Sequence, residues 1–139
     1  MATPSIEQLN SGAVVGFDRL YGLELVELSD IEVRARVAVR DELKQPYGLI
    51  HGGVYASLAE SMTSLATAIA VAEEGKVAMG LSNSTSFLRP ITEGSVNGLA
   101  ERLHKGRTTW VWDVKFSDDA GRTCAVTRMT IAVRDLAKA

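Results

Sequence analysis

The hydrophobic positions of the chain change their period along its length. Over residues 1–21, apolar side chains recur near helical spacing, which predicts a short N-terminal helix. Residues 31–39 instead alternate between apolar and charged side chains, as a half-buried strand requires. The turn-forming pair Ser29-Asp30 separates this strand from an earlier one predicted at 23–28.

The longest helical signal follows Gly52-Gly53. Its apolar stripe, spaced at helical intervals, consists of Leu58, Met62, Leu65, Ile69 and Ala72. The other positions carry small and hydroxyl side chains and Glu60 but no Lys or Arg, so we expect protein to enclose this helix on most sides, and Gly75 is a natural stop. The run is about as long as a membrane span, but a carboxylate inside a membrane is costly, so no membrane contact is expected.

The remaining chain has the pattern of four strands separated by turn-like residues. They are predicted at 77–88, 95–104, 108–117 and 122–133. On the third strand Trp110, Trp112, Val114 and Phe116 share one face, enough for a tightly packed sheet surface. One long helix among such strands predicts a single α+β domain over residues 1–139, with an antiparallel sheet curled around the helix.

Charge and cysteine content exclude several classes of function. Fifteen Lys and Arg residues against seventeen Asp and Glu residues leave no basic field for a nucleic acid. Cys124 is the only cysteine, which suits a reducing cytoplasm and core packing, and no secretory signal is visible at the N-terminus. The histidines His51 and His104 are far apart without a cysteine cluster, so no metal site is predicted.

Glu60 is the residue that the core helix explains least. A carboxylate within an otherwise uncharged helix is costly if it loses solvent, so it reaches solvent, pairs with another group, or takes part in chemistry. Ser64 follows one turn later on the same face, opposite the apolar stripe. A hydroxyl there can help hold a water that Glu60 deprotonates. An ordinary Glu at solvent or at an oligomer interface is the alternative.

The residues before this helix offer a place for an anionic oxygen. Helix N-termini present free N–H groups, and glycines let a ligand approach the backbone closely. A thioester oxygen that becomes an oxyanion would be stabilised by the amide of Gly52 or Gly53, unless these glycines only turn the chain into the helix. Gln45 can orient a carbonyl or a water with its amide, although loop glutamines are commonly solvated.

Basic residues with the chemistry to meet phosphates occur in two turns. Arg89 precedes Pro90, and the run Lys105-Gly106-Arg107 leads into the next strand. Ordinary β-turns with solvated cations are equally consistent with these residues.

A known family shares an ordered set of these residues. The set consists of Gln45-Pro46-Tyr47-Gly48-Leu49-Ile50-His51-Gly52-Gly53, Glu60-Ser61, Ser64, Asn83, Phe87-Leu88-Arg89-Pro90 and Gly106-Arg107-Thr108. With this set the chain closely resembles the hotdog-fold acyl-CoA thioesterases from about Leu23 onward. The branch it resembles contains the phenylacetate-degradation and Arthrobacter-type 4-hydroxybenzoyl-CoA thioesterases, with the related 1,4-dihydroxy-2-naphthoyl-CoA and enterobactin-proofreading enzymes.

The resemblance implies roles for individual residues. Glu60 corresponds to the nucleophile or general base, Ser64 to the hydroxyl that positions water, and the Gly52 amide to the group that polarises the thioester carbonyl. His51 and Gln45 fall where the family orients the thioester or the leaving thiolate. The implied substrate-binding residues are Gly53, Asn83, Arg89, Arg107 and Thr108.

The resemblance also implies a homo-oligomer, a dimer or a dimer of dimers, with active sites at subunit interfaces. The substrate would be an acyl-CoA or aryl-CoA, and CoA would enter as part of the substrate, without a further cofactor. A non-catalytic acyl-CoA-binding domain and an acyl-CoA hydratase or dehydratase are the alternative functions. The acyl group, and CoA against acyl carrier protein as its carrier, stay open.

Overall fold

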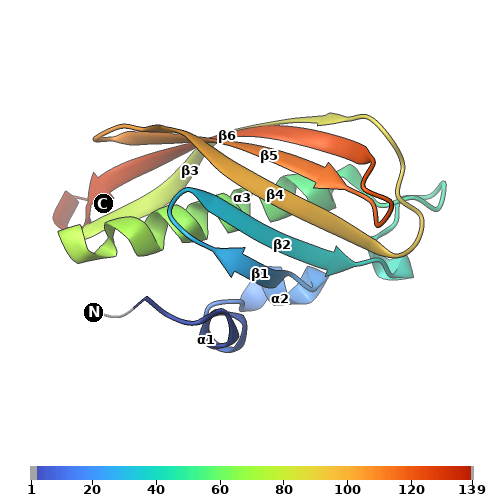
Figure 1. The fold of residues 1–139 in the computed structure, drawn as a ribbon, viewed down its shortest axis with the longest axis horizontal. Coiled ribbons are helices and arrows are strands. Elements are labelled where there is room, and N and C mark those ends of the chain that lie inside the picture. The colour runs from blue at the N-terminus through green and yellow to red at the C-terminus, as the bar shows by residue number, and fades with distance from the viewer. Residues whose placement is uncertain (1–2, 139) are drawn as a thin grey trace.

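A computed structural model of the chain describes residues 3–138, in which an antiparallel sheet curls around one long helix (Figure 1). The strands are β1 (Glu24–Leu28), β2 (Glu32–Ala38), β3 (Lys76–Phe87), β4 (Ser95–Lys105), β5 (Thr109–Ser117) and β6 (Thr123–Asp135). Their order in the sheet is β1-β2-β4-β5-β6-β3, and every neighbouring pair is antiparallel. The helices are α1 (Ile6–Gly12), α2 (Gly16–Tyr21) and α3 (Gly52–Val71), with 3-10 turns η1 (Asp41–Leu43), η2 (Ala72–Glu74) and η3 (Leu136–Lys138). The predicted α+β architecture is confirmed.

Alternation along the strands builds the core on the concave side of the sheet. The four β5 residues predicted to share a face, Trp110 to Phe116 at every second position, are all buried. Cys124 on β6 is buried as well, as its pattern predicted. Each large apolar side chain removed from water contributes roughly 1.5–3 kcal/mol. The concave face of the sheet is therefore the surface against which α3 packs.

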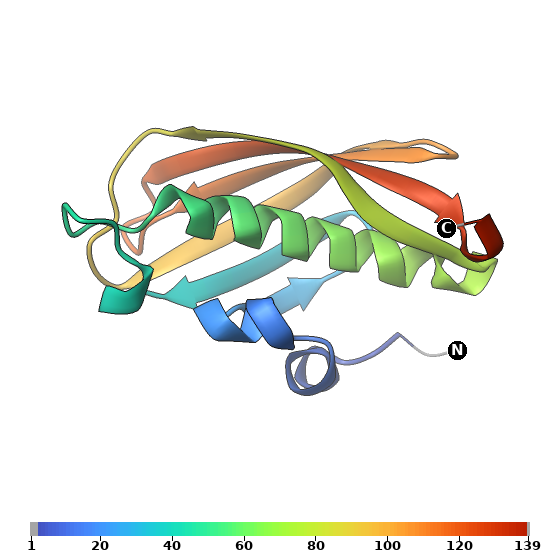
Figure 2. The ribbon, with the colours of Figure 1, turned by 180° about the vertical axis from the view of Figure 1, so that it is seen from behind.

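Helix α3 lies across this concave face with one side uncovered (Figure 2). Its buried side chains include Leu58 and Met62 from the predicted stripe, whereas Ala72 is exposed because the regular helix ends at Val71 and η2 follows. Gly75 then ends the helical segment with a positive φ of 70°. Among the described residues, Gly52–Glu74 is the one helix with the length and hydropathy of a membrane span, and half of its most apolar window is buried inside the fold.

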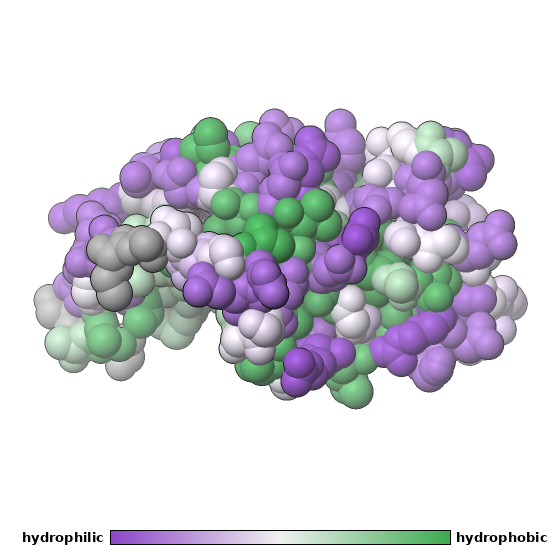
Figure 3. All heavy atoms as spheres, turned by 60° about the horizontal axis from the view of Figure 1, so that its bottom comes forward, coloured by the Kyte–Doolittle hydropathy of each residue, from purple (hydrophilic) through white to green (hydrophobic). Residues whose placement is uncertain are grey.

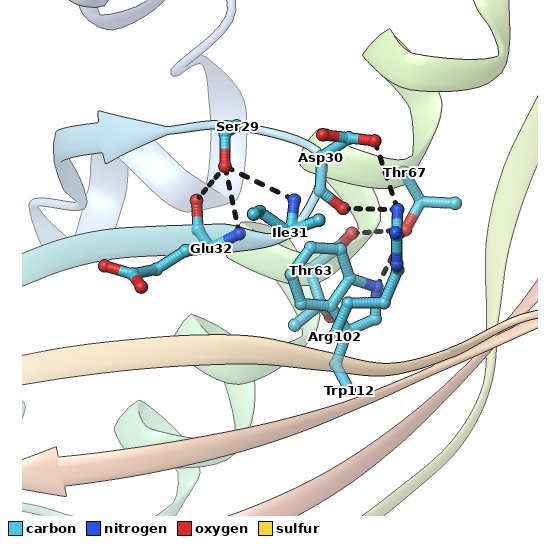
Figure 4. A network of polar contacts seen from close by, with 8 residues as sticks. All are labelled: Ser29, Asp30, Ile31, Glu32, Thr63, Thr67, Arg102 and Trp112. Atoms are coloured by element: carbon cyan, nitrogen blue, oxygen red, sulfur yellow. Dashed lines mark hydrogen bonds and ion pairs between the residues drawn. The ribbon is translucent and has the colours of Figure 1, made fainter.

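Polar contacts fasten α3 and the β1–β2 turn to the sheet (Figure 4). The indole N–H of Trp112 donates to the Thr67 hydroxyl at 3.0 Å, and that hydroxyl donates to the Thr63 carbonyl at 2.8 Å. The Arg102 guanidinium donates to the backbone carbonyl of Asp30 at 2.8 Å. Because the Trp112–Thr67 bond is buried, it holds α3 at one height on β5 without leaving a polar atom unpaired.

The N-terminal segment forms two short helices where one was predicted. Ser5 and Gln8 form a reciprocal capping box that starts α1, and α2 begins at Gly16, whose φ is 57°. The face that carries α1 and α2 shows hydrophobic side chains gathered between polar ones (Figure 3). Its exposed apolar residues include Phe17 and Leu20, which lie on α2.

Candidate functional site

The first turn of α3 has one amide in use and one amide free. His51 caps the helix, and its ring Nδ1 accepts the Gly53 N–H at 2.8 Å. The Gly52 N–H, in contrast, makes no hydrogen bond with any of residues 3–138. The residue pattern left either glycine as the donor, and the resemblance implied Gly52. In the structure only the Gly52 N–H is available to an oxygen from outside the helix.

Gly52 also lies close to an aromatic ring. A Cβ atom at this position would stand 2.8 Å from the Phe87 ring, so no larger residue fits without movement. Phe87 in turn contacts Tyr55, with ring centroids 6.0 Å apart. Burial raises the pKa of Tyr55 to about 12, so this phenol is neutral at physiological pH.

A pocket of about 490 Å³ opens beside Gly52, and we call it the loop pocket. Its lining combines apolar side chains with three of the predicted site residues, Gln45, Gly52 and Arg89. Gln45 begins a tight loop in which its side-chain oxygen accepts the Tyr47 N–H and its backbone carbonyl accepts the Gly48 N–H at 2.9 Å. The structure therefore brings a glutamine, a free amide and an arginine to one concave surface.

Glu60 and Ser64 lie further along the uncovered side of α3. The Glu60 side chain is exposed, so it carries no burial penalty within one chain. The Ser64 hydroxyl is buried and has no hydrogen-bond partner among the described residues. Since buried hydroxyls are nearly always paired, this hydroxyl calls for a water, a ligand or another protein chain.

The eight positions between Gly52 and Glu60 correspond to about 12 Å along the helix axis. Attack on a carbonyl requires the reacting atoms to come within about 3–3.5 Å. A carbonyl held at the Gly52 amide is thus out of reach of Glu60 in the same chain.

The other predicted substrate-binding residues occupy different surroundings. Asn83 on β3 donates its amide to the Ala56 carbonyl of α3 at 2.9 Å, so in this chain it fastens a strand to the helix. Arg107 and Thr108 lie in the β4–β5 turn, at the opposite end of α3 from the loop pocket (Figure 1). Arg107 lines a separate pocket there together with Glu74 and Lys76.

A polar cluster beside Glu60 was not predicted from the sequence. Asp18 of α2 accepts hydrogen bonds from the Tyr21 hydroxyl at 3.0 Å and from the Ser61 hydroxyl at 2.5 Å, which joins α2 to α3. Tyr21 also lines a second pocket of about 550 Å³, the α2 pocket, which contains His51. The only sequence signal was the spacing of Asp18 and Tyr21 at i and i+3, and it does not indicate a partner on another helix.

Tyr21 provides a pH-dependent test of this cluster. Burial raises the pKa of its phenol above the ordinary value of 10.0, and the Asp18 and Glu60 carboxylates raise it further. As the pH rises past 10, the Tyr21 phenol of the unfolded chain loses its proton while that of the folded chain keeps it. The stability that Tyr21 contributes is therefore present below pH 10 and falls above it.

We expect Tyr21→Phe to lower the free energy of unfolding by about 1 kcal/mol near neutral pH, because the bond to Asp18 is lost. The difference from the wild type should shrink as the pH rises past 10 in urea denaturation experiments. Tyr47→Phe is the matched control, since this phenol is 90% exposed. A difference that stays constant with pH would contradict the assignment.

No group of three or more His, Cys, Asp or Glu side chains within residues 3–138 has the geometry to hold a metal ion.

Known proteins of one family match this chain. The family model described as the thioesterase superfamily matches residues 47–125, which include the start of α3 and Glu60. The chain belongs to the thioesterase superfamily. Thioester hydrolysis is accordingly its activity in the general sense, and the antiparallel sheet around α3 is the hotdog fold of these enzymes.

Three relatives cover almost the whole chain. A Pseudomonas aeruginosa esterase is 36% identical over 97% of this chain and 93% of its own length. The proofreading thioesterase EntH of Cronobacter turicensis is 33% identical over 93% of each chain. The 1,4-dihydroxy-2-naphthoyl-CoA hydrolase of Escherichia coli is 35% identical over 93% of this chain and 94% of its own.

Solved structures of two similar proteins share the fold. The crystal structure of the Pseudomonas aeruginosa protein superposes with a TM-score of 0.88 at 35% identity, covering 95% of both chains. A Staphylococcus aureus thioesterase was solved as two alanine variants, one of a glutamate and one of a glutamine. Both superpose with a TM-score of 0.80, at 29% and 28% identity, and cover 84% of this chain and 96% of that one.

Proposed function

We propose that the chain hydrolyses an acyl-CoA or aryl-CoA thioester at a site shared by two protomers. The thioester oxygen is held by the Gly52 amide of one protomer, and Glu60 of the other acts on the carbonyl as nucleophile or general base. The proposal rests on two groups of α3, the free amide of Gly52 at the helix start and the exposed carboxylate of Glu60, which lies about 12 Å further along the helix axis. This separation favours a site completed by a second copy.

The chemistry of the proposed site is that of acyl transfer to water. In the general-base form, Glu60 takes a proton from water, the resulting hydroxide adds to the carbonyl carbon, and the Gly52 amide stabilises the oxyanion. Collapse of this intermediate breaks the carbon–sulfur bond, and the CoA thiolate takes up a proton. In the nucleophilic form the Glu60 carboxylate adds first, and water hydrolyses the resulting anhydride. Neither form needs a cofactor.

The relatives support the choice of residues. In the Staphylococcus aureus thioesterase, the glutamate and the glutamine chosen for replacement lie fifteen positions apart. Gln45 and Glu60 are also fifteen positions apart in this chain. One relative is named as a hydrolase of an aryl-CoA, which favours CoA as the carrier of the acyl group here.

The edge of the sheet supports the shared site. Within the described residues β3 has a strand partner only on its β6 side, and its Met79 and Leu81 side chains are exposed. Two chains that pair antiparallel along β3 would place their α3 helices side by side in opposite directions. Each Glu60 would then approach the partner's helix start, and Ser64 would gain a neighbour.

The same arrangement accounts for the distant phosphate-binding candidates. A two-fold axis near the middle of α3 would carry Arg107 and Thr108 of one protomer toward the loop pocket of the other, where Arg89 already lies. These residues would together meet the phosphates of CoA. We place this dimer, alone or paired into a tetramer, in the cytoplasm.

A thiol-release assay with a panel of aryl-CoA and acyl-CoA substrates tests the proposal. We expect stoichiometric release of free CoA thiol and free acid, with turnover at least 10²-fold above the rate without protein. Tight binding without thiol release would favour a binding domain instead, and formation of a hydroxyacyl-CoA product would favour a hydratase.

A further inference from the structure

Strand β3 passes Glu60 at a position that has no side chain. A Cβ atom on Gly80 would stand 2.8 Å from the Glu60 Oε1 atom and 3.5 Å from its carboxyl carbon. Gly80 is not among the glycines with positive φ, so the strand conformation itself does not require a glycine. Glycine weakens a strand by roughly 0.5–1 kcal/mol relative to alanine, so its presence at position 80 calls for a reason other than the backbone conformation.

The register of β3 explains why this position points at the helix. Gly80 pairs with Ile131, which is fully buried on the concave side, so a side chain at position 80 would point toward α3. The pairing shifts at Leu81, where a β-bulge separates Gly80 from Ser82. Bulges re-aim the residues beside them, and this one lies next to the proposed reactive carboxylate.

Asn83 fixes the height of β3 on the helix. Its side-chain amide donates to the Ala56 carbonyl at 2.9 Å, one helical turn before Glu60. In a regular helix this carbonyl also accepts the Glu60 N–H. The Asn83 side-chain oxygen accepts the Thr85 hydroxyl at 2.8 Å, and that hydroxyl shares a 2.8 Å hydrogen bond with Thr127 on β6. A continuous set of hydrogen bonds thus connects the sheet to the turn that carries Glu60.

We propose that Gly80 and Asn83 are positioning residues for Glu60, in which Asn83 holds β3 at a set distance from α3 and Gly80 leaves the space that the carboxylate occupies. The inference rests on the proposed role of Glu60 and adds to it the two residues that set the carboxylate's place. A displacement of about 1 Å in a reacting group can cost 10²-fold in rate, so small changes at these residues should be visible in turnover.

Gly80→Ala tests the open space, with kcat and KM measured separately. We expect kcat to fall about 10–100-fold with KM and oligomeric state unchanged, because the added methyl group displaces the carboxylate without touching bound CoA. Asn83→Ala should also lower kcat more than it raises KM. Gly12→Ala and Ser82→Ala are the matched controls, since a Cβ at Gly12 meets nothing within 4 Å and Ser82 pairs with Thr130 rather than with a buried residue.

A double-mutant cycle with Glu60→Asp separates positioning from a general effect on the fold. The shorter aspartate relieves the contact with the new methyl group, so Gly80→Ala should lower kcat less in the Glu60→Asp background than in the wild type. Independent, multiplicative effects, or a Gly80→Ala variant with wild-type kcat, would overturn the role of Gly80. A higher KM with unchanged kcat in Asn83→Ala would assign Asn83 to substrate binding. If Glu60→Asp and Glu60→Ala both leave hydrolysis unchanged, the proposed function fails together with this inference.

Discussion

Replacement of Glu60 by alanine should reduce kcat for CoA thioester hydrolysis by about 10²–10⁴-fold. The carboxylate is the only charged group on α3, it is exposed on the uncovered side, and the orphaned Ser64 hydroxyl lies one turn further on. Without it, neither proton abstraction from water nor covalent attack on the carbonyl has a group to perform it. The measurement is steady-state thiol release with the substrate that the wild type hydrolyses fastest.

Two further variants define what Glu60 contributes. Glu60→Gln keeps the shape of the side chain but removes its charge, so we expect it to be about as inactive as the alanine variant. Glu7→Ala removes an exposed glutamate from α1 and should retain wild-type turnover. Full activity in a folded Glu60→Gln variant would exclude the carboxylate from the reaction.

A mixture of two inactive chains should recover activity if the site is shared. One chain carries Glu60→Ala, and the other carries Gln45→Ala with His51→Ala at the helix start. In a mixed dimer, one of the two sites receives its helix start from the first chain and its Glu60 from the second, and is intact. With equal expression and random pairing, about one quarter of all sites are intact, so thiol release should reach about one quarter of the wild-type rate.

The recovery depends only on which chain supplies each residue. Each variant expressed alone is the control and should stay at the background rate. Sedimentation measurements on the mixture verify that the chains associate. A mixed sample that associates but is no more active than either parent would mean that Gln45, His51 and Glu60 act within one chain, against the separation of about 12 Å along α3.

The elements with regular periods could be predicted from the sequence. The strands around β5 and β6 begin and end within a few residues of their predicted limits, because alternating burial leaves a clear period of two. The N-terminal segment was harder, since six- and seven-residue helices contain too few turns to show where one ends and the next begins. The stripe on α3 was partly misplaced for a similar reason: Ala72 continues the period, but the helix changes form at that residue.

In the candidate site, too, some residues could be predicted from the local sequence and others could not. The residues next to one another in the chain, such as Gln45 and the His51-Gly52-Gly53 run, were found together because a loop and a helix start are local features. Gly80 was not singled out, although an isolated glycine within a strand signals close approach of another group. Its neighbour, the Glu60 carboxylate, comes from a different element, and only the fold identifies it.

By itself the sequence determined the helix that bears Glu60, the alternating strands that cover it, and the loop with glycines at its entrance, because each of these depends on residues close together in the chain. The tertiary structure alone decided which amide is free, since the His51 ring occupies the Gly53 N–H and leaves that of Gly52 open. It also decided which strand crosses the carboxylate, since Gly80 of β3 lies beside Glu60. The approach of β3 to α3 is set by packing between elements rather than by the period of any one segment.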